Sequence, residues 1–385
     1  MSRPVRSATE SRTAYYDTAN HDLAAHGVSL SCNIGGNNAG WHLTLPSEPD
    51  TCLASHMSVS TDDDTVPDAL RDVVLAIVRD RPLVSVTPTR MTPRASTADS
   101  NPRGETLDRA HWTVGEQFEN LLRWDRAVRV DAPDAVHQMR VAIRTIRSLL
   151  QASPAVFGLS GDAWLLEELR ELAIVLGTAR DAEVLAARHQ RALDALPAKL
   201  IRGPVRTRLV DGAGGRYRSG LQASISMMRS ARYFRLLDAL DAVTTTGSSG
   251  VTAQGKRAAA KTIADGYKRL AKRVKAAAAA EPADRDAMLH RIRKSAKRLR
   301  YVAAANGAAC VAETAKAIQT LLGDHQDSVV SRADLAELAD AANTAGEDAF
   351  TYGLLYQQET DVAHDCEQAL PAALKSLKKA VHKAV

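Results

Sequence analysis

Two short basic segments of this 385-residue chain carry side chains of the kind that bind phosphate. In each segment a histidine is followed by basic residues at offsets of three, seven and ten. The two sets are His137, Arg140, Arg144 and Arg147, and His290, Arg293, Lys297 and Arg300. A guanidinium offers a rigid fork of donors that matches two phosphate oxygens, and a protonated imidazole donates two hydrogen bonds. This chemistry is anion binding. Neither segment supplies the carboxylate pair, metal cage or activated nucleophile that catalysis needs.

Both segments must be helices for this spacing to matter. At about 100° per residue, offsets of three, seven and ten keep the basic side chains on one stripe. An apolar stripe lies beside it in each copy: Met139, Ile143, Ile146 and Leu150 in the first, and Ile292, Ala296, Leu299 and Ala303 in the second. We therefore expect each helix to pack one face into a core and to present positive charge on the neighbouring face. Acidic residues are nearly absent at helical spacing within the stripes, which favours binding over internal ion pairs.

A second motif follows each basic segment and indicates an internal duplication. Residues 175–181 (VLGTARD) resemble residues 321–327 (LLGDHQD), and both contain an apolar pair, a glycine, three residues and an aspartate. The glycine follows the histidine by 40 residues in the first copy and by 33 in the second. Two motifs in the same order predict two similar helical bundles, related by a pseudo-two-fold, with their basic faces brought toward each other. Such a pair would focus positive potential on an anion.

Further residues extend this set. Lys294 and Arg298 add charge to the second copy only. Supporting roles are expected for Arg180, Asp181, Tyr301, His325 and Asp327, with the two aspartates orienting arginines of the stripes. A third basic helix over residues 256–275 would line or extend the site through one face: Arg257, Lys261, Lys268, Lys272 and Lys275. A solvated helix face is the alternative interpretation of that third helix.

The amino-acid composition agrees with a helical protein that binds an anion. Hydrophobic residues make up 45% and aromatic residues 4% of the chain, so an Ala- and Leu-rich helical fold is favoured over a sheet. The net charge is +5, but residues 291–300 alone hold six basic residues and no acid. The four cysteines have no disulfide or metal-ligand spacing, and no apolar run is long enough to span a membrane. We expect a cytoplasmic protein.

The first 100 residues have a different character. Residues 27–31 and 41–45 alternate on either side of a Gly/Asn turn, which predicts a β-hairpin, and residues 68–79 show helical spacing. Proline, serine and threonine mark residues 85–106 as a linker, and residues 244–255 as a loop between the two halves. The acidic run at residues 62–64 is interpreted as a solvated turn rather than a metal site.

The segments HQMRVAIRTIR (137–147) and HRIRKSAKRLRY (290–301), together with both Leu-Gly motifs, resemble the CHAD family of histidine-bearing helical domains. The resemblance covers roughly residues 111–385. It implies a mainly α fold of two antiparallel four-helix bundles, with a basic central cavity that binds inorganic polyphosphate. Thr145 stands where the family often has arginine, which makes the first copy less positive than the second.

The N-terminal piece resembles part of a CYTH domain, the triphosphate-tunnel fold, through residues 15–18 (YYDT) and 39–46 (AGWHLTLP). The opening strand of alternating glutamates is missing, Ser31, Cys32 and Asn33 stand at usually basic positions, and Thr44 replaces a lysine. About 100 residues also supply too few strands for a closed tunnel that could hold metal and triphosphate. We expect a small α+β remnant that is folded partially, if at all, and inactive as a triphosphatase.

The sequence thus predicts residues 1–100 as this remnant plus linker, and residues 101–385 as a helical domain with repeats at about 111–243 and 256–385. The predicted function is non-catalytic binding of polyphosphate, without a cofactor or metal of its own, although divalent cations could accompany the polymer. Such binding would associate the protein with polyphosphate granules. A triphosphatase or polyphosphatase of the CYTH type, and a basic helical nucleic-acid-binding protein, are the alternatives. Scarce aromatic residues argue against single-stranded nucleic acid. The oligomeric state stays open.

Overall fold

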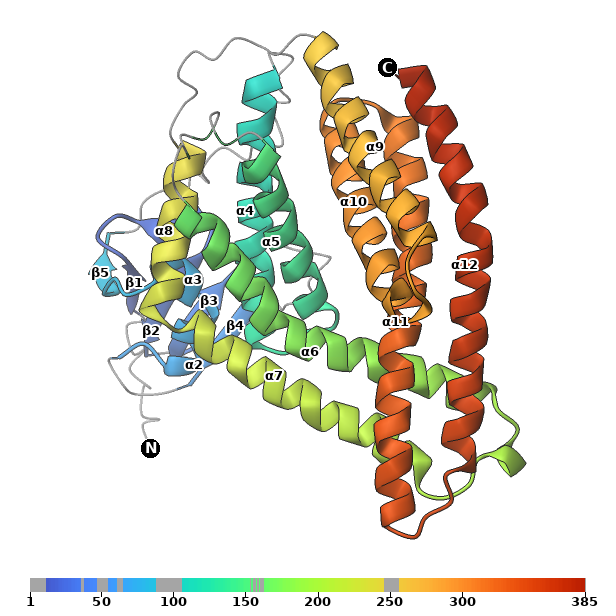
Figure 1. Ribbon diagram of the computed structural model, residues 1–385. Coiled ribbons are helices and arrows are strands. Elements are labelled where there is room, and N and C mark those ends of the chain that lie inside the picture. Colours follow the sequence, from blue (N-terminus) through green and yellow to red (C-terminus); the bar gives the residue numbers. More distant parts are fainter. Residues whose placement is uncertain are drawn as a thin grey trace, which may run out of the picture. The chain divides into compact units, whose positions relative to one another are not determined.

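A computed structural model describes residues 12–35, 38–46, 55–60, 65–87, 106–152, 154, 157, 159, 163–245 and 256–384. The acidic run at 62–64 and most of the two linkers at 85–106 and 244–255 lie outside these residues. The chain divides into two compact units. The first contains residues 1–180 and 219–251, and the second contains residues 181–218 and 252–385. The fold is mainly α with a small N-terminal sheet, as the sequence predicted (Figure 1).

The first unit begins with a five-stranded antiparallel sheet in the order β4-β3-β2-β1-β5. The strands are β1 (Arg12–Asp17), β2 (Ser29–Ile34), β3 (Gly40–Thr44), β4 (His56–Val59) and β5 (Val84–Val86). Strands β2 and β3 form the predicted hairpin. Strand β5 was not expected, because Val84–Val86 overlaps the start of the segment interpreted as a linker. Its pairing with β1 brings it into the sheet and corrects that boundary.

One face of this sheet is well packed, so the expectation of partial folding at best was wrong for the described residues. Leu30 opposes Leu43 and Cys32 opposes Trp41 across the hairpin, and all four are buried. This face packs with the short helices α1 (Asp22–Ala25), α2 (Asp68–Val73) and α3 (Leu75–Val78). The helix predicted over residues 68–79 is therefore present, interrupted at Val74. The buried Asp17 carboxylate accepts the backbone N–H groups of Leu23 and Ala24 at 2.9 and 3.0 Å, which fixes the start of α1.

Helices complete the first unit: α4 (Thr106–Arg129), α5 (Ala135–Ala152), α8 (Ala231–Thr245), and parts of α6 (Ala163–Ala195) and α7 (Gly212–Met228). Three of them, α4, α7 and α8, are joined by a buried polar network. Arg129 donates to Asp125 through Nε at 2.6 Å and to the carbonyl of Met228 at 3.0 Å. Tyr233 on α8 donates to the same Asp125 at 2.8 Å, and burial raises the pKa of this tyrosine well above its ordinary value. The network satisfies a charge pair that would otherwise be costly to bury.

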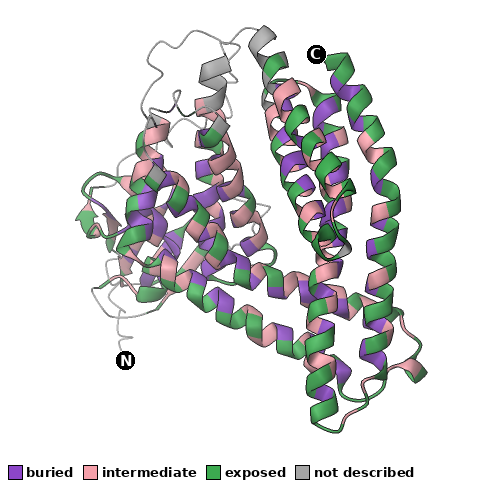
Figure 2. Cartoon of the chain, in the orientation of Figure 1, coloured by how far each residue is buried: buried purple, intermediate pink, exposed green. Residues whose placement is uncertain are grey.

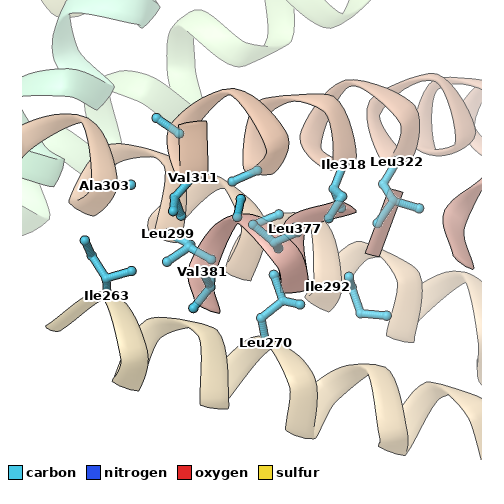
Figure 3. Packing of buried hydrophobic residues seen from close by; sticks show 14 of the residues in the cluster. Ile263, Leu270, Ile292, Leu299, Ala303, Val311, Ile318, Leu322, Leu377 and Val381 are labelled. Carbon is cyan, nitrogen blue, oxygen red and sulfur yellow. The ribbon is translucent and has the colours of Figure 1, made fainter. Parts of the chain in front are cut away.

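The second unit contains a four-helix bundle made of α9 (Lys256–Ala278), α10 (Arg285–Ala305), α11 (Ala309–Thr344) and α12 (Phe350–Ala384). Apolar residues from all four helices interdigitate, among them Leu270, Ile292, Ile318 and Leu377 (Figure 3). The described residues also include two short 3₁₀ helices, Ala198–Leu200 and Pro282–Asp284, and a short π-helix, Thr207–Asp211.

Helices α10 and α11 end in the same way. Gly307 and Gly346 both adopt a left-handed conformation with φ of 73°. The N–H of the residue after each glycine bonds back to the last turn, from Ala308 to Ala303 at 2.8 Å and from Glu347 to Ala342 at 2.9 Å. This hydrogen bond satisfies a carbonyl group at the end of each helix, and the left-handed glycine turns the chain sharply. These turns set the antiparallel course of α10, α11 and α12.

Candidate anion-binding helices

Helix α5 carries the first basic stripe, and its burial follows the predicted pattern. Met139, Ile143, Ile146 and Leu150 are completely buried. The four residues of the basic stripe are all half-buried: His137, Arg140, Arg144 and Arg147. An α-helix with one buried stripe holds the adjacent stripe at the edge of the core, where long basic side chains reach solvent. Figure 2 shows buried and exposed residues alternating in this way along the helices.

Helix α10 repeats this pattern. Ile292, Ala296, Leu299 and Ala303 are buried, and the basic stripe is again half-buried throughout: His290, Arg293, Lys297 and Arg300. Equivalent residues of the two copies thus share the same exposure class. The extra charges of the second copy, Lys294 and Arg298, are exposed and lie on a face next to the stripe. In the first copy these two positions hold Val141 and Thr145, so the second copy presents the wider positive surface.

The repeated glycine lies directly against the first arginine of each stripe. Gly177 on α6 faces the guanidinium of Arg140, whose Cζ would be 3.4 Å from a Cβ placed on the glycine. In that position, the same Cβ would overlap Nη1 of Arg140. Gly323 on α11 faces Arg293, with Nε and Nη2 each 3.6 Å from the corresponding Cβ position. The Leu-Gly motif and the basic stripe are therefore neighbours in both copies, and in the first copy the missing Cβ of Gly177 leaves space for the guanidinium of Arg140.

His290 is in a positive environment. Burial lowers the pKa of this histidine, and the neighbouring Lys294 and Arg293 lower it further, while a hydrogen bond with Gln326 has the opposite effect. The neutral imidazole is therefore favoured over the imidazolium beside two cations. A bound anion would reverse that preference, since it would stabilise the protonated ring.

Asp327, the last residue of the second Leu-Gly motif, interacts electrostatically with Arg293 and with Arg188 of α6. Burial raises the pKa of Asp327, and these two arginines oppose that change. Arg188 itself donates from Nε and Nη2 to the two carboxylate oxygens of Glu359 on α12. The sequence did not indicate Arg188 or Glu359, because their partners lie far along the chain and outside any repeated motif.

At the end of the second stripe, Lys297 and Arg300 contact neutral side chains. Arg300 donates to the side-chain oxygen of Gln319 at 3.2 Å, and its Cζ lies 5.5 Å from the ring centre of Tyr301. Lys297 approaches the same ring with Nζ at 5.7 Å. Contacts of this kind orient cations without neutralising them.

The supporting residues are placed less uniformly. Arg180 lies 3.5 Å from Asp134, the residue that precedes α5, and Asp181 follows it on α6. Four lysines of α9 are exposed: Lys261, Lys268, Lys272 and Lys275. The side chain of Arg257 lies outside the described residues. His325 is almost fully buried, and together with Asp286 and Glu367 it forms the one group within the described residues that could hold a metal ion.

Among the residues that the structure describes, none of the helices combines the length and the apolar character that a membrane span requires.

Comparison with known proteins places this arrangement in a family. Residues 113–336 match the family model of the CHAD domain. The chain is 46% identical to the uncharacterized protein Rv2226 of Mycobacterium tuberculosis strain H37Rv, over an alignment of 464 residues that covers 96% of this chain and 90% of the relative. The protein MT2285 of strain CDC 1551 matches equally well. The alignment is longer than this chain, so these relatives contain segments that it lacks.

Two solved structures share the fold. The CHAD domain from the plant Ricinus communis superposes with a TM-score of 0.53 and 26% identity, and the match covers 70% of this chain and 91% of that domain. PptA from Streptomyces chartreusis gives a TM-score of 0.57 at 19% identity, over 71% of this chain and all of the other. These comparisons do not confirm the CYTH-like resemblance of the N-terminal piece. With the repeated basic helices and their glycines described above, the family match shows that the chain belongs to the CHAD family.

Proposed function

We propose that the chain binds inorganic polyphosphate along the basic stripes of α5 and α10, without hydrolysing it. The observation that carries this proposal is the repeated pairing of a stripe arginine with a glycine, Arg140 with Gly177 and Arg293 with Gly323. In the first copy the glycine also leaves the space that the guanidinium occupies, and an arginine that must present its fork to a ligand benefits from a fixed position.

The polymer suits these stripes for a physical reason. Polyphosphate carries about one negative charge per phosphate on a flexible chain, and the stripes offer several similar cations in sequence. Each contact displaces condensed counterions, so the affinity should fall steeply with salt, by analogy with nucleic-acid phosphates. The half-buried position of the stripes strengthens each contact relative to a fully solvated cation.

Mutation of the stripes tests the proposal directly. Replacing Arg140, Arg144, Arg293 and Lys297 with alanine should abolish the retardation of long-chain polyphosphate in a gel-shift assay with the full-length chain. A matched control removes four exposed lysines of α12: Lys375, Lys378, Lys379 and Lys383. Both variants lose the same charge, but only the first should lose binding. Equal losses, or retained binding by a folded stripe variant, would remove the stripes from the site.

Two other functions remain alternatives that the same protein preparation can test. Nucleic acid could occupy the same cations, and competition between polyphosphate and DNA of equal total charge decides between them. The proposal fails if DNA is preferred. Hydrolysis by the N-terminal sheet would release phosphate from tripolyphosphate in the presence of Mg²⁺ or Mn²⁺, and we expect no release above that of buffer alone.

A further inference from the structure

Three side chains from three helices of the second unit converge on one point. His325 comes from the middle of α11, Asp286 from the first turn of α10, and Glu367 from α12. The Nε2 atom of His325 lies 3.6 Å from Oδ1 of Asp286 and 3.4 Å from Oε1 of Glu367. All three potential ligand atoms lie within 4.8 Å of one another.

The histidine nitrogen at the centre of this group has no hydrogen-bond partner among the described residues. His325 is 2% exposed, and its Nε2 is buried without a hydrogen bond among the described residues. The two carboxylate oxygens are farther away than the usual N–H···O distance of about 2.7–3.2 Å. A buried polar nitrogen in this condition destabilises the fold unless something satisfies it.

The separations fit a metal ion better than a hydrogen bond. Zinc binds imidazole nitrogen and carboxylate oxygen at roughly 2.0–2.2 Å in tetrahedral geometry, which places neighbouring ligand atoms about 3.3–3.6 Å apart. The two distances from Nε2, 3.4 and 3.6 Å, lie within that range. One nitrogen and two oxygens leave a fourth position for water, as in zinc sites with three protein ligands.

Two arginines orient the carboxylates toward the histidine. Arg285 donates from Nε to Oε2 of Glu367 at 2.6 Å, and Arg332 approaches Oδ2 of Asp286 at 3.7 Å. Each arginine contacts the oxygen that the histidine does not face, so the other oxygen stays directed at Nε2. Partners of this kind commonly fix the ligands of protein metal sites.

The duplication gives an internal comparison. The residues equivalent to Asp286 and His325 in the first copy, by their offsets in the repeated motifs, are Pro133 and Ala179. Neither can bind a metal through its side chain. The convergence is therefore a property of the second copy and does not follow from the shared fold.

We propose that Asp286, His325 and Glu367 bind a divalent transition-metal ion, with zinc preferred, and that the ion joins α10, α11 and α12. A mixed set of one imidazole and two carboxylates suits zinc, and affinity for such sites generally rises toward the end of the first transition series. The joined helices belong to one bundle, so the ion stabilises that bundle. This proposal is independent of polyphosphate binding.

The test is a calorimetric titration of ZnCl₂ into chelator-treated, full-length protein in a buffer free of phosphate and polyphosphate, with a thermal melt in parallel. We expect one zinc ion per chain. At a free zinc concentration one hundred times the dissociation constant, the Tm of the bundle should rise by about 5–10 °C. Glu367→Gln, whose side chain is partly exposed, should weaken binding at least tenfold and remove the rise in Tm, and His325→Ala should do the same.

Matched controls separate this site from other zinc ligands. His364→Ala removes an exposed histidine of α12, and Cys310→Ser removes an exposed thiol of α11, so neither should change the titration. Zinc binding that survives Glu367→Gln in a folded protein overturns the proposal, as does the absence of any saturable zinc binding by the unmodified chain.

Discussion

The two repeated glycines should respond in opposite ways to the same substitution. Gly177 and Gly323 both lie inside long helices, where alanine is normally favoured by about 0.5–1 kcal/mol. A Cβ on Gly323 would meet Arg293 at 3.6 Å, which is ordinary van der Waals contact. A Cβ on Gly177 would overlap the guanidinium of Arg140, which must then move.

The expected magnitudes follow from these contacts. Gly323→Ala should raise the free energy of unfolding by about 0.5–1 kcal/mol, or the Tm by roughly 1–4 °C, and should change polyphosphate affinity by no more than about twofold. A charge-assisted contact is worth about 1.5–3 kcal/mol, so Arg140→Ala should weaken binding by roughly 10- to 100-fold. Gly177→Ala keeps the charge but displaces it, and we expect at least about a threefold loss of affinity with little gain in Tm.

Calorimetric titration with polyphosphate of defined length, combined with thermal melts, gives both quantities on the same samples. The double variant Arg140→Ala with Gly177→Ala provides the decisive comparison, because the glycine should have no further effect on affinity once its arginine is gone. Additive losses of affinity in the double variant, or equal losses from the two glycine substitutions alone, would refute the assignment of Gly177 as the residue that positions Arg140.

Three further predictions concern pH and packing. Binding of an anion beside His290 should raise the depressed pKa of this histidine, so binding takes up protons. The affinity for the anion should therefore rise as the pH falls, by at most tenfold per pH unit. His290→Gln should reduce this pH dependence, as measured by calorimetric titration in buffers of different ionisation enthalpy. Burial lowers the pKa of His189 to about 4, so the folded state resists protonation, and stability should be lost as the pH falls below the unfolded-state value of 6.5. The loss at pH 5 relative to pH 7 is roughly 2 kcal/mol, and a denaturant series on His189→Gln should show a smaller one. Gly220→Ala should destabilise the first unit by about 1–3 kcal/mol in a thermal melt, because its Cβ would lie 2.6 Å from the backbone nitrogen of Ala179; a neutral result would mean that the helix backbones separate at little cost.

Local periodicity is the part of this structure that the sequence predicts well. The apolar and basic stripes of α5 and α10 follow from residues within one helix, and the buried Ile143 and Ile292 confirm their registers. The hairpin of β2 and β3 could be predicted equally well, since a Gly/Asn turn joins two adjacent segments in which apolar and polar residues alternate. In each case the informative residues are close together in the chain.

Contacts between distant segments could not be predicted in the same way. Val84–Val86 forms β5 by pairing with β1, although nothing in that short segment distinguishes it from a linker. Asp286 and Glu367 approach His325 only because three helices fold together, and no spacing in the sequence relates them. The glycine motif was recognised as a repeat, but its contact with a stripe arginine is visible only once the helices are packed.

The packing of the N-terminal sheet determines where the chain can be divided. The family match begins at residue 113, whereas the compact unit that contains α4 and α5 also includes the sheet and its helices. Arg129 of α4 reaches Asp72 of α2 at 3.2 Å, and Arg79 pairs with Asp238 of α8. A fragment that begins at the family boundary would remove Asp72 from a buried arginine and uncover the apolar surface where α3 meets α4. The family match and the compact unit therefore have different borders here, and an excised helical domain should be expressed with its sheet attached.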